Sequence, residues 1–586
     1  MVKERLLHNM KICQVPTCYT KLAEKMLTNR KTCLQFDDYI SPTFTITNGT
    51  TQGCPSSMVY YTFYNASLIN TAKNKNETSI GFVDDTMFLA VADSLQEAHN
   101  IIKDMMERLD GGFDWSTTHN SPFELSKLAL MNFPRSLQEI LPTDLELTRH
   151  NTDGSTTNQT INTVSSYKYL GVIIDPKIRW TTYHQKVTAN ATWWTHQVTR
   201  LSRVSGGMPP KRLRQLYNTV AVPAFTYAAD IWYLGLHLSP KGLKCLGSIT
   251  ITKKLTSIQR RITRAITGAL STTAGNVLEA HTNLLPIDLL FNKVLFRAAT
   301  RIASLPSSHP LFSLSCRAAK RYVRQHRSPL HNLFHSTVIK PDTVETVDVF
   351  RRCSSYIPSF DSAILNSKPE ALAAAKIHHN TKVSVYCDGS SFENGTGGAA
   401  ALYINKIEKS SLRYYLRPAN KHTVYEGKLI GLALAMHLLT SLCFRLTSYT
   451  VIGTDNQASI KALTNQRPHP GHYLLDRIHD AAECLHTKQH RLSNPRTTNP
   501  VKRNAIDLQI HWTPSHANFS PNERADALAK WAARGSSSYR RLLPPFLHKK
   551  PLPLSFPSLR QGNLSNIHKK WKKRWKTSLL GQLRTT

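Results

Sequence analysis

The sequence has no uninterrupted apolar stretch of about 18 residues, which is the length that a helix needs to cross a membrane. Its first residues, MVKERLLHNMKICQ, also lack the apolar core of a secretory signal peptide. We therefore expect an intracellular protein, in the nucleus or the cytoplasm, that is neither secreted nor held in a membrane.

Cysteine is sparse and scattered, with 10 residues in a chain of 586. The closest pair, Cys13 and Cys18, has no second Cys or His pair at the spacing of zinc ligands. We therefore expect reduced thiols, with neither structural disulfides nor zinc.

Acidic residues are few beside basic ones. The chain has 74 Lys and Arg against 38 Asp and Glu, a formal charge of +36 and a pI near 9.9. Positive charges of this number would repel one another if nothing neutralised them. We therefore expect a polyanionic partner such as RNA or DNA, rather than a basic surface without a partner. The length also exceeds that of a single hydrophobic core, so several folding units are expected.

Composition divides the chain into five blocks. In order they are a block of helices and strand pairs, a Trp- and Tyr-rich block, a basic helical block that ends in a linker, an α/β unit and a basic tail, at residues 1–135, 136–235, 236–375, 381–535 and 536–586. The tail contains HKKWKKRWKTS, which suits stacking on bases together with phosphate contacts. An amphipathic helix that docks back on the protein is the equal alternative.

The α/β unit predicts a mixed sheet flanked by helices. KVSVYCDGS alternates as a strand whose end carries Asp388, and YTVIGTDNQ is a strand that ends at Asp455. AAALYI and LQIHWTP are further strands, and a third strand is expected after AAALYI. The order strand, strand, strand, helix, strand, helix, strand, helix gives the mixed β-sheet.

Two helices of this unit begin at predicted capping boxes. Thr423 and Glu426 open the apolar helix LIGLALAMHLL, and Ser520 with Glu523 opens the helix that carries Asp526. Four carboxylates therefore stand at predicted strand ends or in helices. Carboxylates that converge can hold two Mg²⁺ ions about 4 Å apart, as phosphodiester cleavage requires.

The segments VYCDGSS, YEGKLIGLALA, VIGTDNQASI and HWTPSHANFSPNERADALA resemble, in order, the four conserved blocks of the RNase H family. The resemblance implies an endonuclease that uses two Mg²⁺ ions, or Mn²⁺, to cut the RNA strand of an RNA/DNA hybrid. It implies four metal ligands and a mobile histidine that helps product leave, at Asp388, Glu426, Asp455, Asp526 and His516. Taken singly, each of these residues also fits a purely structural role, as a turn residue, a helix cap or a surface group.

A second site is predicted in GFVDDTMFLA, where Asp84 and Asp85 lie at a hairpin turn. With NGTTQGCPSSM upstream and YKYLGVIIDPKIRW downstream, this order resembles the reverse transcriptases of non-LTR retrotransposons. By that resemblance Asp84 and Asp85 are palm aspartates. Gln52 and Gly53 belong to the block that packs on template and nucleotide, and Lys127 lies in the block that assists the pyrophosphate.

This polymerase is expected to be incomplete. The family carries its first palm aspartate and its fingers well upstream of the block at Gln52, where only 51 residues remain. The acidic pair there, Asp37 and Asp38, lies in a predicted hairpin and cannot supply the missing ligand. We therefore expect an α/β multidomain chain with a truncated, inactive reverse-transcriptase palm and thumb, a helical connection and an RNase H-like domain.

Two alternatives to this function stay open. One is an active RNA-directed DNA polymerase whose missing block comes from elsewhere, and the other is a nucleic-acid binder without catalysis. The sequence does not indicate the oligomeric state.

Overall fold

The computed structural model describes residues 1–51, 53–134, 144–150, 155–202, 206–238, 244–320, 323, 327–348, 351–353, 355–446, 449–493, 506–548 and 551–578. The chain divides into two compact units, Met1–Lys186 and Val187–Thr586. In the described parts of the chain, no helix combines the length and the apolar character that crossing a membrane requires.

The first unit alternates helices with strand pairs, as its sequence predicts. Its helices are α1 (Lys3–Ile12), α2 (Thr17–Leu27), α3 (Pro55–Ile69), α4 (Leu95–Glu107) and α5 (Gly112–Thr118). Its strands pair as β1 (Arg30–Thr32) with β4 (Phe44–Ile46), β2 (Gln35–Phe36) with β3 (Tyr39–Ile40), β5 (Glu77–Phe82) with β6 (Asp85–Ala90), β7 (Asp144–His150) with β8 (Thr156–Asn162), and β9 (Tyr167–Tyr169) with β10 (Val172–Ile174).

A buried ion pair fastens the hairpin of β5 and β6 to the end of α4. The Arg108 guanidinium donates to both carboxylate oxygens of Glu77, at 3.1 and 2.7 Å. These hydrogen bonds lower the pKa of Glu77 to about 2. The pairing matters because a buried carboxylate without such partners would be costly.

The second unit begins with a helical part. Its helices are α6 (Thr181–Leu201), which runs across the boundary between the units, α7 (Pro210–Leu216), α8 (Val222–Thr226), α9 (Ala229–Trp232), α10 (Ile249–Thr267), α11 (Gly275–Thr282), α12 (Ile287–Ala303), α13 (Pro310–Lys320) and α14 (Pro329–Thr337), with the strand pair β11 (Leu236–Leu238) and β12 (Cys245–Gly247). α10 and α12 lie in the block that the sequence predicts to be basic and helical. The ring of Phe291 stacks on Tyr233, with centroids 4.1 Å apart, and so ties α12 to the end of α9.

A six-stranded mixed sheet forms the rest of this unit, in the order β13-β18-β17-β14-β15-β16. The strands are β13 (Asp361–Ala363), β14 (Val383–Phe392), β15 (Gly395–Ile404), β16 (Ile407–Pro418), β17 (Tyr449–Thr454) and β18 (Asp507–Trp512). β14, β15 and β16 are antiparallel neighbours, whereas β14, β17, β18 and β13 are parallel. From β14 onward the predicted order of strands and helices is confirmed, except that two helices, Gln457–Leu463 and His472–Ser493, stand where one was predicted.

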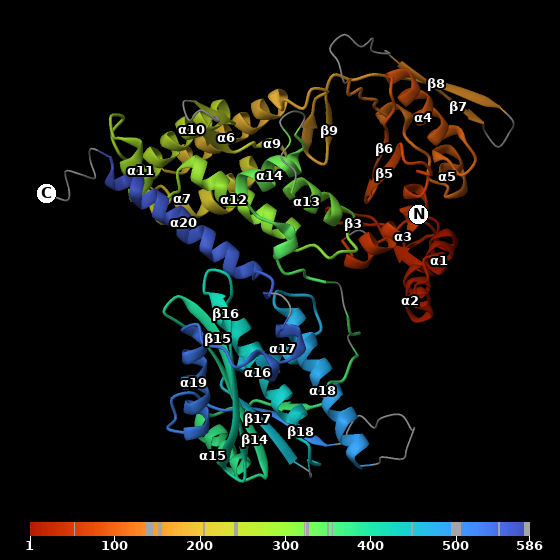
Figure 1. Ribbon diagram of the computed structural model, residues 1–586. Helices are drawn as coiled ribbons and strands as arrows, with labels where there is room; N and C mark the ends of the chain where they lie inside the picture. The colour runs from red at the N-terminus through yellow and green to blue at the C-terminus, as the bar shows by residue number, and fades with distance from the viewer. Residues whose placement is uncertain are drawn as a thin grey trace. The chain divides into compact units, whose positions relative to one another are not determined.

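Helices cover both faces of the sheet (Figure 1). They are α15 (Lys368–His379), α16 (Val424–Ser441), α17 (Gln457–Leu463), α18 (His472–Ser493) and α19 (Ser520–Ala533). Val385 and Cys387 of β14 join the core with α16 and α18, and the alternate residue Tyr386 joins the core with α15 and α19. This period-two alternation is what a strand buried on both faces requires.

Two local predictions were wrong. The stretch from 340 to 380, expected to be a linker, contains β13, which adds to the edge of the sheet, and α15, whose N-cap is Ser367. α19 has Phe519 as N-cap without a side-chain hydrogen bond, so the second capping box does not form. Ser520 cannot cap this helix because it already stands inside the first turn.

Of the two alternatives for the basic tail, the structure shows the docked helix. The tail contains the helix α20 (Phe556–Lys576), which packs along α12. Ile567 is 1% exposed, and Arg574 Nη2 lies 2.5 Å from Asp288 Oδ2. Pro557, the last of the tail prolines, stands in the first turn of the helix, where its missing N–H costs nothing.

Candidate functional site

Asp388 and Asp455 come together where two neighbouring parallel strands stop pairing. The last pair between β14 and β17 is Cys387 with Thr454, so each aspartate is the next residue along its strand. Asp455 directly follows β17, but Asp388 lies inside β14, which continues to Phe392. The strand end that the sequence predicts at Asp388 is thus the end of its parallel pairing only.

The side chain of Lys428 lies between these two carboxylates. Its ammonium nitrogen is 2.7 Å from Asp455 Oδ1 and 3.2 Å from Asp388 Oδ1. The side chains of Lys428, Asp388 and Asp455 are 17%, 7% and 11% exposed, so water screens these pairs weakly. Asp388 Oδ1 also accepts a hydrogen bond from the backbone N–H of Gly389 at 2.7 Å. The ammonium group of Lys428 is therefore the counter-ion of the two aspartates.

The position of Lys428 follows from a close crossing of α16 over β14. A Cβ atom on Gly389 would lie 2.1 Å from the backbone nitrogen of Lys428 and 2.2 Å from the carbonyl carbon of Gly427. No residue with a side chain fits there, so glycine permits the contact. The crossing holds the second turn of α16 directly beside Asp388.

Burial and the nearby charge of Asp455 raise the pKa of Asp388, and the Lys428 ammonium opposes this rise. For Lys428 itself, burial alone would lower the pKa. The two aspartates outweigh burial and raise the pKa of Lys428 above its ordinary value. Lys428 therefore stays charged between them.

Glu426 has a different role, although it is only two residues away on the same helix. Its Oε2 accepts hydrogen bonds from Thr423 N at 2.7 Å and from Thr423 Oγ1 at 3.0 Å, which completes the predicted capping box. Its Oε1 lies 3.5 Å from His422 Nδ1. It is 1% exposed, and burial, followed by the charge of Glu426, raises the pKa values of Glu345 and Tyr473. Glu426 thus acts as a helix cap in a separate buried cluster.

Asp526 and His516 also stand apart from the aspartate pair. Asp526 lies in the middle of α19, where its Oδ2 accepts a hydrogen bond from Lys530 Nζ at 2.6 Å. His516 is exposed, in a left-handed backbone conformation before α19. Within the described residues, no three His, Cys, Asp or Glu side chains are grouped so that they could hold a metal ion. The structure thus brings together two of the four predicted ligands.

Sequence reasoning missed Lys428, although it belongs to the segment YEGKLIGLALA. The acid of that segment, Glu426, was the candidate because metal sites need carboxylates. The missed signal is helical spacing: residues 426 and 428 are about 200° apart around the helix, so at most one of them can face the sheet end.

The predicted polymerase residues lie in the first unit. Asp84 is in the turn of the hairpin of β5 and β6, and Asp85 is the first residue of β6, paired with Phe82. The predicted hairpin turn is confirmed. Gly53, with φ +82°, precedes α3, whereas Gln52 lies outside the described residues.

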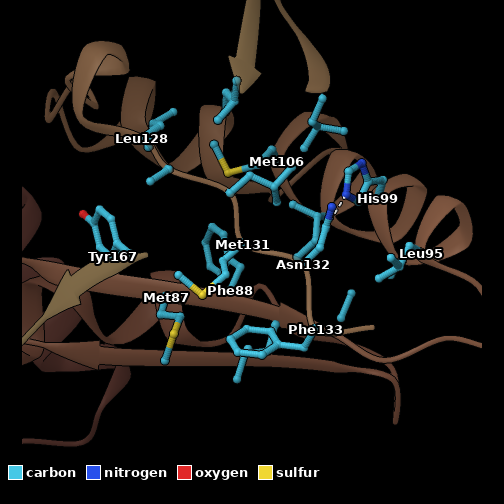
Figure 2. A pocket seen from close by; sticks show the side chains of 18 of the residues that line it. Met87, Phe88, Leu95, His99, Met106, Leu128, Met131, Asn132, Phe133 and Tyr167 are labelled. Atoms are coloured by element: carbon cyan, nitrogen blue, oxygen red, sulfur yellow. Dashed lines mark hydrogen bonds between the residues drawn. The ribbon is translucent and has the colours of Figure 1, made fainter. Parts of the chain in front are cut away.

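Lys127 pairs with Glu124, at 2.5 Å, on an exposed turn. With Asp85, it lines a cavity of about 470 Å³ whose walls are mainly apolar (Figure 2). His99 Nε2 and Asn132 Oδ1, 2.7 Å apart, form a hydrogen bond in the same wall. Two of the predicted polymerase residues therefore border one cavity, but its mainly apolar lining does not match a triphosphate.

Comparison with known proteins identifies the C-terminal domain. A family model described as RNase H matches residues 380–534. The chain therefore contains an RNase H domain near its C-terminal end, with the predicted mixed sheet flanked by helices. The resemblance of the earlier residues to reverse transcriptases of retrotransposons stays a prediction. No curated protein matches the chain.

Solved structures of RNase H proteins are similar to this domain. The N-terminal RNase H domain of a Mycobacterium tuberculosis protein, solved as a fusion with maltose-binding protein, is 16% identical and covers 26% of this chain and 99% of its own, with a TM-score of 0.20. RNase H1 from Halobacterium salinarum is 21% identical and covers 27% of this chain and 100% of its own, with a TM-score of 0.19. LC11-RNase H1 in complex with an RNA/DNA hybrid is 16% identical and covers 26% of this chain and 98% of its own, with a TM-score of 0.20.

Proposed function

We propose that this chain is an intracellular nucleic-acid-binding protein whose RNase H domain holds RNA/DNA hybrids and does not cut them. The proposal rests on the family of the domain together with one observation about its site. The ammonium of Lys428 lies between Asp388 and Asp455, at 3.2 and 2.7 Å.

Hydrolysis by this family depends on Mg²⁺, and the side chains present do not fit that ion. Mg²⁺ requires a near-octahedral shell of oxygen atoms, and a two-ion site needs several converging carboxylates. Here two carboxylates converge, and a cationic side chain already contacts both of them. The other two predicted ligands are engaged elsewhere, Glu426 as a helix cap and Asp526 with Lys530. Hybrid cleavage, the activity predicted from the resemblance, is therefore not the function that this geometry favours.

The charge of the helical part supports binding. Burial and the nearby positive charges of Arg297 and Arg301 lower the pKa of Arg560, which α20 brings against α12. Such a cluster of like charges is relieved when phosphate groups lie beside it. A hybrid differs from a DNA duplex in the 2′-hydroxyl groups of its RNA strand, which allow a protein to distinguish the two.

Binding of the full chain to three duplexes of one sequence, the RNA/DNA hybrid, RNA/RNA and DNA/DNA, tests this proposal. We expect the hybrid to bind most tightly and log K to fall linearly with log salt concentration. Arg297→Ala should reduce the slope of log K against log salt concentration by about one. Arg351→Ala is the matched control, because Arg351 is already neutralised by Asp480 at 2.9 Å. Equal affinity for all three duplexes would contradict the proposal.

A retroelement origin, with the first unit related to a reverse transcriptase, is a second part of the proposal. The confirmed hairpin at Asp84 and Asp85 supports it. Primer extension on an RNA template is the test. Synthesis by the wild-type chain that is lost in Asp84→Ala would support this relation, and synthesis that persists in Asp84→Ala would contradict it.

A further inference from the structure

We propose that the Lys428 side chain replaces a divalent cation in this RNase H domain, and that removing its charge uncovers a cation site made by Asp388 and Asp455. This inference rests on the proposed function, since it explains why the domain would hold a hybrid without cutting it. The ligand class is a hard divalent ion, Mg²⁺ or Mn²⁺, because both donors are carboxylates.

The first argument is competition for the same atoms. Lys428 Nζ contacts Oδ1 of Asp455 and Oδ1 of Asp388, and the latter oxygen also accepts the Gly389 N–H. An ion that bridged the pair through these oxygens would lie within about 5 Å of the ammonium, because a Mg–O contact is about 2.1 Å and Lys428 Nζ is 2.7 Å from Asp455 Oδ1. Two cations at that separation in a poorly hydrated site repel each other strongly. The ion could bind only after the ammonium had left.

The second argument is that Lys428 is held in place. Its backbone is fixed where α16 crosses β14 at Gly389, and the capping box of Thr423 and Glu426 fixes the first turn of the helix. The side chain is 17% exposed. Withdrawing the ammonium would leave two adjacent carboxylates without a counter-ion, and this cost opposes exchange for a metal ion from solution.

The third argument is that the pair carries excess negative charge without Lys428. Asp388 and Asp455 would then resemble the paired carboxylates that bind divalent ions, with water completing the shell, as Mg²⁺ sites commonly allow. The pair Lys530 with Asp526 offers a contrast in the same domain. It is an i,i+4 pair on α19 with one carboxylate, and its side chains are 45% and 29% exposed. Removing Lys530 should create no such site.

Mn²⁺ binding to the full chain, measured by electron paramagnetic resonance of the free ion, tests the inference without nucleic acid. We expect Lys428→Met to bind one more Mn²⁺ ion than the wild type, at least about tenfold more tightly than the wild type binds at this pair. The gain should vanish in Lys428→Met with Asp455→Asn, and Lys530→Met should bind like the wild type. Lys428→Gln is the second variant, because its amide can still donate to both aspartates and so preserve the fold.

The outcomes separate clearly. A gain in Lys428→Met or Lys428→Gln that needs Asp455 supports the inference. A wild-type chain that already binds Mn²⁺ at a site lost in Asp455→Asn overturns it, and so does the absence of a new site in both folded Lys428 variants. Because no hybrid is present, a failure of hybrid binding leaves this result unaffected, so the two proposals can fail independently.

Discussion

Replacing Lys428 by methionine should destabilise the RNase H domain where β14 meets β17. Methionine keeps most of the length of the side chain but removes its charge. Breaking a buried ion pair by removing one partner costs about 3–5 kcal/mol. The site here keeps some exposure, 17% for Lys428 and 7% and 11% for the two aspartates, so we expect about 2–4 kcal/mol at pH 8.

Hydrogen exchange followed by mass spectrometry measures this loss within the full chain, because it reports the opening of each segment separately. In Lys428→Met, amides of β14 and β17 should exchange roughly 30- to 800-fold faster, which is 2–4 kcal/mol at about 1.4 kcal/mol per factor of ten. The loss should shrink at pH 5, because Asp388, whose pKa is already raised, can then take up a proton. Lys530→Met, at an exposed position of α19, should change protection by less than about 0.5 kcal/mol.

A double-mutant cycle gives the sharper result. Asp388→Asn removes one of the two carboxylates that Lys428 neutralises, so adding it to Lys428→Met should recover part of the lost protection. Additive losses in the double mutant would refute the reasoning. So would unchanged protection in Lys428→Met, because Lys428 would then not be needed as a counter-ion.

Three further outcomes are expected, each from a different contact. Burial, together with a neighbouring carboxylate, raises the pKa of Glu345 from 4.5 to about 7. Its contribution to stability is therefore full below pH 4.5 and is lost as the pH rises through 7. In Glu345→Gln, the midpoint of unfolding should therefore change less with pH across that window. Gly389→Ala should abolish the cooperative unfolding of the domain in urea, because the added methyl group meets the backbone of α16, whereas Gly275→Ala, where nothing lies within 4 Å, should leave it intact. Ile567→Asp should detach α20, seen as rapid hydrogen exchange over Phe556–Lys576, and slow exchange there would contradict the docking of this helix.

The fold of the C-terminal domain could be predicted from the sequence because each of its elements has a strong local signal. The alternation around Val385 and the capping box at Thr423 are short-range patterns, and both occur in the structure as predicted. Edge elements were harder. β13 has three residues and is held by pairing with β18, a partner almost 150 residues away, so no local pattern reveals it.

The candidate site could be predicted only in part, because its geometry depends on a crossing between two elements. Asp388 and Asp455 follow from the strand pattern, since neighbouring parallel strands bring their ends together. Which residue of α16 faces them depends on how closely that helix approaches Gly389. That approach places Lys428, rather than Glu426, beside the pair, and the sequence alone does not state it.

The decisive measurement follows a hybrid labelled on its RNA strand during incubation with the full chain in Mg²⁺ and, in parallel, in EDTA. We predict a retained complex with intact RNA in both conditions, at closely similar affinity, because the cation of the site is Lys428. RNA cut only in Mg²⁺, and no longer cut by Asp455→Asn, would contradict this and establish the domain as a hybrid-specific ribonuclease.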